Sequence, residues 1–379
     1  MHVSGRRWRD LLVLSSLGAV LLATSTGTAA AKPAHADPLQ RQVDAVHESG
    51  AVGVSAEVTS PDTRDVARAG TARKGTGKPM PRDGRFRIGS ATKTFTATVV
   101  LQLVGEGRLS LDDTVEHWLP GVVSGNGNDG NRITVRQLLQ HTSGLHDIGP
   151  ELSVLKSADG YRAERFRTRT PEELVRLAME YPPDFTPDEG KWSYSNTNYL
   201  LAAMITQEVT GRSWAREVKD RIIRPLGLKD TSTPGAFPFI LGPHAQGYAF
   251  DAGIDVTVLN SSMAVGSGSL ISTAHDLNRF YAALLGGGLL DPEQLEEMTA
   301  SVDAPELGVG YGLGLAEIPL SCGGSYFGHR GELLGYITWG GATRDGSRTA
   351  VVYVTSGGGK ETQQAMMTLV DRELCGTRS

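Results

Sequence analysis

The stretch Phe86-Arg87-Ile88-Gly89-Ser90-Ala91-Thr92-Lys93-Thr94-Phe95 places a serine and a lysine three residues apart at the start of an apolar run. Residues i and i+3 lie on one face of a helix, so the amine of Lys93 can reach the hydroxyl of Ser90. Apolar residues continue at helical spacing to Val104, and Gly105 ends the run. The stretch therefore predicts a core helix with a serine nucleophile in its first turn, where free backbone amides favour a developing oxyanion.

The same serine and lysine also fit a simpler interpretation. A serine is common at the start of a helix, where its hydroxyl caps a free backbone amide, and a lysine one turn later is usually solvated. Four-residue matches of this kind occur by chance in many sequences. The assignment of Ser90 and Lys93 to catalysis therefore depends on other motifs along the chain.

The first residues have the pattern of a secretory signal peptide. Three arginines stand among the first nine residues, an apolar run follows from 11 to about 23, and Ala34-His35-Ala36 is typical of a cleavage site. The apolar run is too short for a comfortable membrane span. We therefore expect residues 1–36 to be removed and residues 37–379 to be secreted, without a stable membrane span.

Composition and charge argue against several classes of protein. The net charge of −5 comes with no basic patch, so we expect no nucleic-acid partner. None of the nine histidines forms an H-E-x-x-H pattern, and neither cysteine lies at metal-ligand spacing, so we expect no metal and no cofactor. In a secreted protein Cys322 and Cys375 are expected to form one disulfide, and two free thiols are the alternative.

Strand patterns occur at both ends of the secreted chain, and helical patterns occur between them. The expected strands are residues 53–58, 66–72, 311–316, 335–339 and 350–355, and the main expected helices are residues 39–47, 134–140, 171–181, 198–210, 214–223, 274–285 and 362–374. This order predicts an α/β (α+β) fold with one antiparallel sheet built from both chain ends and covered by the terminal helices. The sheet subdomain would comprise residues 37–89 and 305–379 and the helical subdomain residues 90–304, with a cleft between them.

Two further motifs bring chemically useful side chains close to predicted turns. Tyr194-Ser195-Asn196 precedes the helix expected from residue 198, and can present a phenol and a carboxamide to a cleft. Gly328-His329-Arg330-Gly331 precedes an inner strand, where glycines let the backbone approach a ligand closely. Each motif has a simpler interpretation. The tyrosine would pack its ring while the asparagine caps a helix, and the second motif would be an ordinary turn.

In this order and spacing, the three motifs resemble those of the penicillin-recognising serine hydrolases. This β-lactamase/transpeptidase-like family includes class C β-lactamases, esterases, D-aminopeptidases and D-alanyl-D-alanine carboxypeptidases. The resemblance covers nearly all of residues 37–379, includes residues 133–137 and 310–315, and is closest to secreted actinomycete D-alanyl-D-alanine carboxypeptidases. The placement of Cys322 and Cys375 also resembles that group.

The resemblance implies a role for each motif residue. Ser90 would be the nucleophile and Lys93 its proton partner, and Tyr194 would act as a phenolate general base and then protonate the leaving amine. Asn196 would bind the amide carbonyl of the substrate. His329 would lie across the cleft and help to hold Tyr194 and the substrate.

The resemblance also implies an oxyanion hole and a structural histidine. The backbone amides of Ser90 and Glu332 would form the oxyanion hole, a role that does not depend on either side chain. His141, in the stretch Gln140-His141-Thr142-Ser143-Gly144-Leu145, matches a family motif as well. We interpret it as a residue that ties down the end of a helix rather than as a catalytic group.

The chain departs from the carboxypeptidase pattern at positions expected to shape the cleft and read a terminal carboxylate. No threonine follows His329, Ala316 stands about where an arginine is expected, and Met263 stands where an aromatic residue is expected. Arg330 could supply the missing cation for a carboxylate. Equally, Glu332 could attract an ammonium group, as an aminopeptidase would require.

We therefore expect a secreted serine hydrolase that forms an acyl-enzyme at Ser90, with D-alanyl-D-alanine carboxypeptidase activity on cell-wall-type peptides as the first interpretation. An esterase, a D-aminopeptidase, a β-lactamase and a peptide acyltransferase of the same fold are the alternatives. The substrate would be a D-amino-acid-containing peptide or a small ester or amide, β-lactams would be inhibitors, and the protein would be a monomer. A non-catalytic binder of cell-wall peptides is a further alternative, although such a protein has no need of a nucleophile.

Overall fold

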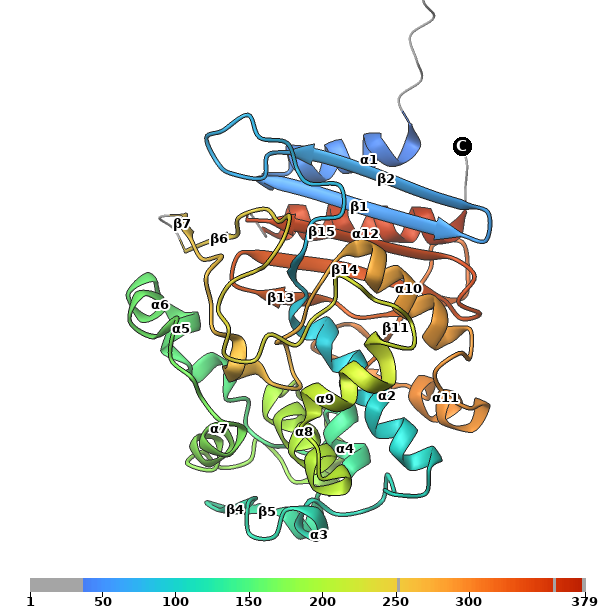
Figure 1. Cartoon of the computed structure of the whole chain (residues 1–379). Helices are drawn as coiled ribbons and strands as arrows, with labels where there is room; N and C mark the ends of the chain where they lie inside the picture. Colours follow the sequence, from blue (N-terminus) through green and yellow to red (C-terminus); the bar gives the residue numbers. More distant parts are fainter. Residues whose placement is uncertain (1–36, 251–252, 357–358, 377–379) are drawn as a thin grey trace, which may run out of the picture. The chain divides into compact units, whose positions relative to one another are not determined.

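An antiparallel sheet contributed by both ends of the chain is the frame of the structure (Figure 1). The structure is a computed structural model that describes residues 37–250, 253–356 and 359–376. In spatial order the strands are β2 (Thr63–Gly70), β1 (Gly53–Ser60), β15 (Thr349–Thr355), β14 (Tyr336–Thr343), β12 (Ser325–Gly328), β11 (Ala316–Pro319), β10 (Val309–Tyr311) and β9 (Val302–Ala304), and β13 (Gly331–Leu333) also pairs with β14. The expectation of one sheet built from both chain ends is confirmed.

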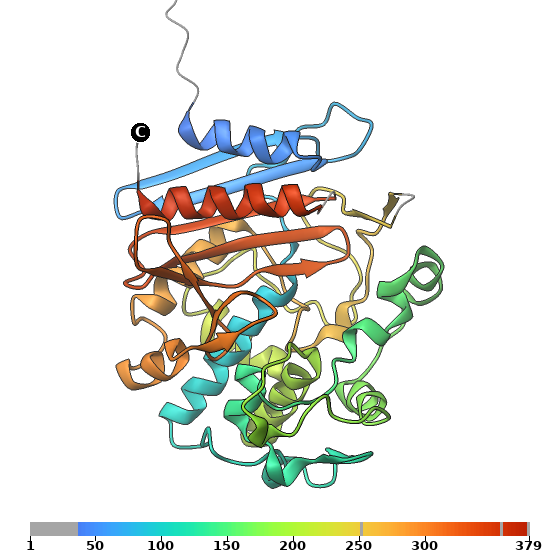
Figure 2. The same ribbon diagram turned by 180° about the vertical axis from the view of Figure 1, so that it is seen from behind.

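Two terminal helices cover one face of this sheet. α1 (Pro38–Glu48) packs on β1 and β2, and α12 (Lys360–Cys375) packs on β14 and β15, as Figure 2 shows. Val352 and Val354 of β15 lie in the core that these helices form with the sheet. Because β15 alternates between its two faces, Val351 and Tyr353, the sequence neighbours of Val352, face the other side of the sheet.

The other face of the sheet is covered by α10 (Ala274–Leu285), which contacts β1, β14 and β15. Val351 and Tyr353 of β15 belong to the core on this side. α10 falls within the range 90–304 that the sequence assigns to a helical subdomain, yet it packs directly on the sheet. The described residues from Asp37 onward form one compact unit by their contacts.

The helix that follows Ser90, α2 (Thr92–Gly105), runs through the core of the helical part and contacts α8, α9 and α11. Because nearly all of α2 is buried, its polar side chains need partners. Thr94 donates a hydrogen bond to the carbonyl of Gly314 at 2.7 Å, and Thr96 donates one to the carbonyl of Gly266 at 2.7 Å. α2 is therefore a rigid support for the residues at its N-terminal end.

Shorter elements complete the helical part. The helices are α3 (Val115–Trp118), α4 (Val135–Gln140), α5 (Ser153–Lys156), α6 (Ala158–Glu164), α7 (Pro171–Ala178), α8 (Asn196–Thr210), α9 (Trp214–Val218) and α11 (Pro292–Thr299). The short strand pairs are β3 (Phe86–Arg87) with β8 (Ile271–Ser272), β4 (Ser124–Gly125) with β5 (Asn128–Asp129), and β6 (Tyr248–Ala249) with β7 (Ile254–Asp255). α8 begins two residues earlier than expected, directly after Ser195. This places the second motif at the N-terminal end of a buried helix.

The prediction of one strand over residues 311–316 is wrong. The chain turns between β10 and β11, and the amide of Gly312 donates to the carbonyl of Leu315 at 2.8 Å. Gly314 has φ +74, and a Cβ on it would lie 2.7 Å from Cβ of Ala97. Alternation of glycine with apolar residues resembles a strand, but here these glycines allow a tight turn against α2.

The predicted disulfide between Cys322 and Cys375 is present, and it links the turn between β11 and β12 to the end of α12. The predicted signal peptide, residues 1–36, lies outside the described residues. Within the described ranges, no helix is long and apolar enough to cross a membrane, and no group of three or more His, Cys, Asp or Glu residues could hold a metal ion.

Candidate active site

Ser90 lies in a single 3₁₀ turn, Gly89–Ala91, directly before α2. This turn packs against β13. Gly89 has φ +53, and a Cβ on it would lie only 2.5 Å from the backbone nitrogen of Glu332. Glycine is therefore required here, and its absent side chain brings the backbone of β13 beside the nucleophile turn.

Lys93 connects the nucleophile turn to two other segments of the chain. Its Nζ donates to Oγ of Ser90 at 3.3 Å, to Oδ1 of Asn196 at 2.7 Å and to the carbonyl of Ser267 at 3.0 Å. The side chain is fully buried, and burial lowers its pKa to about 7, although the nearby charge of Asp147 acts in the opposite direction. A large fraction of Lys93 is therefore a neutral amine near neutral pH.

Tyr194 approaches the same point from the segment before α8. Nζ of Lys93 lies 4.7 Å from the centre of its ring, and its phenol is hydrogen-bonded with Ser90. Burial raises the pKa of Tyr194 well above its ordinary value, and the bond with Ser90 only partly offsets this. The expectation of a phenolate does not fit this environment, because burial favours the neutral phenol.

His141 lies under the second motif rather than at the reacting centre. It is completely buried, has φ +62 at the end of α4, and its ring centre is 4.4 Å from that of Tyr194. Its Nδ1 accepts a hydrogen bond from the backbone N–H of Ser195 at 3.2 Å. Its backbone carbonyl accepts a hydrogen bond from the backbone N–H of Ser193 at 3.1 Å. These contacts hold Tyr194 in place and agree with the structural role expected from the sequence.

Asn196 is held by a residue that the sequence did not single out. Its Nδ2 donates to both carboxylate oxygens of Asp147, each at 3.1 Å, and its backbone amide donates to Oδ1 of Asp147 at 3.0 Å. With its Oδ1 bonded to Lys93, the carboxamide links Asp147 to Lys93. The binding of a substrate carbonyl by Asn196 stays a prediction.

His329 lies across the cavity and contacts Tyr311. Its Nε2 and the Tyr311 hydroxyl are 2.9 Å apart, and its Nδ1 contacts the carbonyl of Arg330. Burial, assisted by the positive charge of Lys93, lowers the pKa of His329 to about 3, so the ring is neutral. Among the described residues its hydrogen-bond partners do not include Tyr194, which it was expected to hold.

These side chains meet at a cavity of about 350 Å³. The residues that line it are Ser90, Tyr194, Glu306, Leu307, Val309, Tyr311, Ala316, Ile318, His329, Arg330, Glu332, Trp339 and Met367. Arg330 and Glu332, the two candidate specificity residues, form an ion pair with each other. Ala316 lines the cavity as expected, whereas Met263 is 6% exposed and packs in the core instead.

The sequence model of the Beta-lactamase family matches residues 38–374. The chain belongs to the β-lactamase family. It has the fold that this family shares with penicillin-binding proteins. A particular closeness to actinomycete D-alanyl-D-alanine carboxypeptidases stays a prediction.

This β-lactamase-family chain is similar to the following three proteins, among others. The D-stereospecific amidohydrolase from Streptomyces sp. is 41% identical with a TM-score of 0.82, over 89% of this chain and 98% of that one. The D-amino acid amidase from Ochrobactrum anthropi SV3, complexed with L-phenylalanine amide, is 28% identical with a TM-score of 0.77, over 89% and 96%. Penicillin-binding protein 4* of Bacillus subtilis is 28% identical over 69% of this chain and 58% of that protein. The chain spans about half the length of the curated relatives it matches first.

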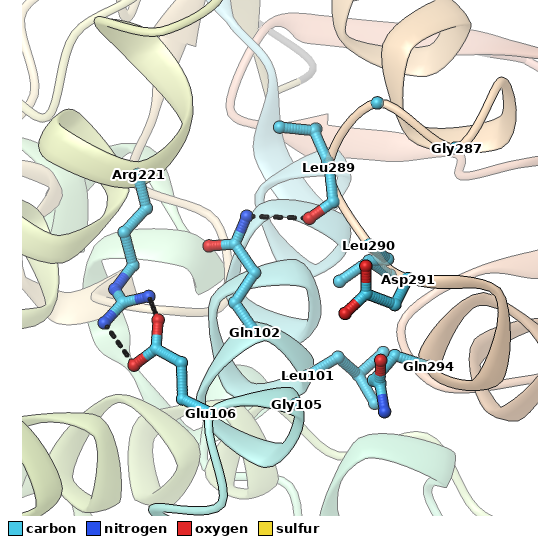
Figure 3. Close-up of a pocket in the computed structure, with 11 residues that line it drawn as sticks. Leu101, Gln102, Gly105, Glu106, Arg221, Gly287, Leu289, Leu290, Asp291 and Gln294 are labelled. Carbon is cyan, nitrogen blue, oxygen red and sulfur yellow. Dashed lines mark hydrogen bonds and ion pairs between the residues drawn. The ribbon is translucent and has the colours of Figure 1, made fainter.

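Figure 3 shows a different cavity of this β-lactamase-family chain, at the C-terminal end of α2. Arg221 binds the carboxylate of Glu106 there, and Gln102 donates to the carbonyl of Leu289 at 3.0 Å. None of the predicted catalytic residues is among the described residues that line it. The cavity at Ser90 is therefore the candidate active site, although the cavity in Figure 3 is larger, at about 450 Å³.

Proposed function

We propose that the protein is a D-stereospecific amide hydrolase, which forms an acyl-enzyme at Ser90 from substrates with a free amino group. D-amino acid amides and peptides with an amino-terminal D-residue are the substrates in this proposal. The observation that carries it is the ion pair between Arg330 and Glu332 at the candidate active site.

The charges around the cavity favour an ammonium group over a carboxylate. The guanidinium of Arg330 is bound by Glu332, and His329 is neutral. Glu306 also lines the cavity, and it has no ion-pair partner among the described residues. A substrate carboxylate would therefore have to displace Glu332 from Arg330, whereas an ammonium group meets an unpaired carboxylate.

The proposed mechanism begins with Lys93 in its neutral form. Lys93 accepts the proton of the Ser90 hydroxyl while the oxygen attacks the amide carbonyl, and the backbone amides of Ser90 and Glu332 bind the resulting oxyanion. Tyr194, as a neutral phenol, donates a proton to the leaving amine, so the C–N bond breaks and an ester to Ser90 remains. Proton transfer from Lys93 restores the phenol.

Water then completes the cycle. It attacks the Ser90 ester, a proton returns to the Ser90 oxygen, and the free acid leaves. Asn196 keeps the amine of Lys93 directed at Ser90 through its bond at 2.7 Å. A pKa of about 7 suits Lys93 to both directions of proton transfer near neutral pH.

The D configuration is supported by the relatives rather than by the charges. A D-stereospecific amidohydrolase matches over nearly its whole length at 41% identity, and a D-amino acid amidase matches at 28%. The apolar walls of the cavity, which include Ile318, Trp339 and Met367, suit a large apolar side chain. D-Phenylalanine amide is therefore a suitable first test substrate.

A substrate panel tests the proposal. We expect wild-type protein to hydrolyse D-phenylalanine amide, to leave L-phenylalanine amide almost untouched, and to act weakly on a peptide that ends in D-alanyl-D-alanine. Ser90→Ala should lower turnover at least about 1,000-fold and abolish labelling by a phosphonate, with unchanged thermal unfolding. Failure to release ammonia from D-amino acid amides would overturn the proposal.

D-Alanyl-D-alanine carboxypeptidase activity is the second candidate, and the same panel decides it. Arg330 lines the cavity and would favour it if the substrate displaced Glu332. Similarity to penicillin-binding proteins also supports it. Rapid hydrolysis of the D-alanyl-D-alanine peptide, with no action on D-amino acid amides, would establish this candidate instead.

We also propose that residues 1–36 are a cleaved export signal and that the mature chain acts outside the cell as a monomer. The support is the basic, apolar and small-residue order of that segment. Amino-terminal sequencing of protein from the culture medium and light scattering test both points. An intact Met1 in cell-associated protein would contradict export.

A further inference from the structure

A second cavity, of about 850 Å³, lies beside the candidate active site. We call it the β9 groove: its walls are α4, residues 184–193 and residues 302–306, which include β9. Glu306 lines both cavities, and its carboxylate accepts the backbone N–H of Tyr194 at 3.4 Å. The groove therefore begins beside the residue that we expect to protonate the leaving amine.

The basic side chains of the β9 groove are already neutralised from outside it. Nη1 of Arg136 lies 2.5 Å from Oε2 of Glu297, and Nζ of Lys191 lies 2.7 Å from Oε2 of Glu189. Neither glutamate lines the groove. These two positive charges therefore do little to attract an anion into it.

The acidic side chains of the groove are less well compensated. Asp303 and Glu306 are exposed, and neither has an ion-pair partner among the described residues. Asp184 lies 3.5 Å from Nδ1 of His146, which compensates its charge only when that ring is protonated. The groove is therefore negative overall, and one of its carboxylates, that of Glu306, lies where it meets the active site.

Trp192 forms part of the wall of the groove. It lines the groove and is 8% exposed, and its indole N–H has no hydrogen-bond partner within the described part of the chain. The indole nitrogen itself is buried, so Trp192 offers the groove the surface of its ring rather than a hydrogen-bond donor. An amide of a single amino acid would fill the active site and reach no residue of the groove beyond Glu306, which the two cavities share.

From these contacts we propose that the β9 groove binds the leaving-group side of a peptide substrate, and that Asp303 and Glu306 select a positively charged residue there. This inference rests on the proposed function. The catalytic cavity would hold the D-residue whose carbonyl Ser90 attacks. The next residue would pass Tyr194 and enter the groove, where a lysine-like side chain would meet the two carboxylates.

Binding to the Ser90→Ala protein tests the groove without turnover. The probes are three dipeptide amides that differ only in the charge of the second residue: D-Phe-Lys-NH₂, D-Phe-norleucine-NH₂ and D-Phe-Glu-NH₂. Exposed ion pairs are individually weak, so we expect the lysine peptide to bind about 3- to 10-fold more tightly than the norleucine peptide, and the glutamate peptide to bind least tightly. Calorimetric titration gives the three dissociation constants, and 1 M NaCl should remove most of the difference.

Charge-removing variants decide whether the groove is the cause. In the Ser90→Ala background, Asp303→Asn with Glu306→Gln should bring the three dissociation constants within about twofold of each other. Glu293→Gln, which removes one exposed charge on α11 outside the groove, should keep the original order. The inference is overturned if the wild-type groove shows no charge preference, or if the preference survives the double variant.

The outcome is separable from that of the proposed function. Release of ammonia from D-phenylalanine amide by the wild-type protein tests the function, and it involves no groove residue other than Glu306, which the two cavities share. Charge-selective binding without such hydrolysis would leave the groove as a peptide site and overturn the function. Hydrolysis without charge-selective binding would support the function and overturn the inference about the groove.

Discussion

The carboxamide of Asn196 joins Asp147 to Lys93. Its Nδ2 donates to both oxygens of Asp147 at 3.1 Å, and its Oδ1 accepts from Nζ of Lys93 at 2.7 Å. Burial lowers the pKa of Lys93 to about 7, and the charge of Asp147 keeps it from falling further. One carboxylate therefore acts on Lys93 both through a hydrogen-bonded side chain and through its charge.

The pH dependence of catalysis should follow Lys93. Below a pH of about 7 its amine is protonated and cannot accept the Ser90 proton, whereas above that pH it is neutral. We therefore expect kcat/KM for D-phenylalanine amide to rise about tenfold per pH unit below pH 7, to level off, and to fall above about pH 8, where the α-amino group of the substrate loses its charge. Rates measured from pH 5 to 9, with circular dichroism to verify folding, give the profile, and a flat profile across pH 7 would contradict the role of Lys93.

Asp147→Asn should move that profile to lower pH. Without the negative charge, burial alone acts on Lys93, so its pKa falls further and the neutral amine persists in more acidic solution. The plateau rate should also fall, by about 10-fold, because Asn196 loses a charged acceptor for its amide. A profile that shifts to higher pH, or does not move, would show that Asp147 does not influence Lys93 in this way.

Gly89 should tolerate no side chain. Alanine there would adopt a positive φ and would place its Cβ 2.5 Å from the backbone nitrogen of Glu332. We expect Gly89→Ala to lower the free energy of unfolding by roughly 2–4 kcal/mol and to lower activity at least 100-fold, because β13 must move away from Ser90. Urea unfolding and the amide assay measure the two effects.

Gly287→Ala is the matched control for this change. Gly287 has φ +75, but a Cβ on it would have no neighbour within 4 Å. The positive φ alone should cost about 1 kcal/mol, with full activity retained. Equal effects of the two substitutions would mean that a collision with β13 is not the reason why position 89 requires glycine.

Local patterns predicted the parts of the site that depend on neighbours in sequence. The spacing of Ser90 and Lys93 was enough to place the amine beside the hydroxyl, because one helical turn brings them together. Asp147 was missed because it reaches Asn196 across 49 residues and stands in a loop without a recognisable pattern. Ser267 was missed because it acts through its carbonyl, which every residue possesses.

Burial explains most of the remaining differences. The sequence suggested a phenolate at Tyr194 because it placed a cation nearby, but it could not show that the phenol is enclosed. Enclosure raises the pKa of Tyr194 and favours the neutral form. In the same way, the sequence around Gly314 has the pattern of a strand. The pattern could not show that this segment packs closely against α2, where the chain makes a turn.

The final prediction concerns Arg330 and Glu332, which bind each other at the mouth of the candidate active site. Each of them cancels the charge of the other, so removing one should expose the other to the substrate. Arg330→Ala frees Glu332, and we expect it to raise kcat/KM for D-phenylalanine amide, whose amino group is positive, by about 3- to 10-fold. Glu332→Gln frees Arg330, and it should lower that value while improving action on peptides that end in a carboxylate.

The backbone amide of Glu332 is unchanged in the glutamine variant, so loss of the oxyanion hole cannot account for the result. A neutral substrate, phenyl acetate, supplies the control, because it carries no charge for either side chain to bind. Both variants should hydrolyse it at rates within about twofold of wild type. If Arg330→Ala instead lowers the rates for carboxylate-ended peptides and leaves D-amino acid amides unaffected, then Arg330 binds substrate in spite of its partner. The carboxypeptidase alternative would then be the better description of this site.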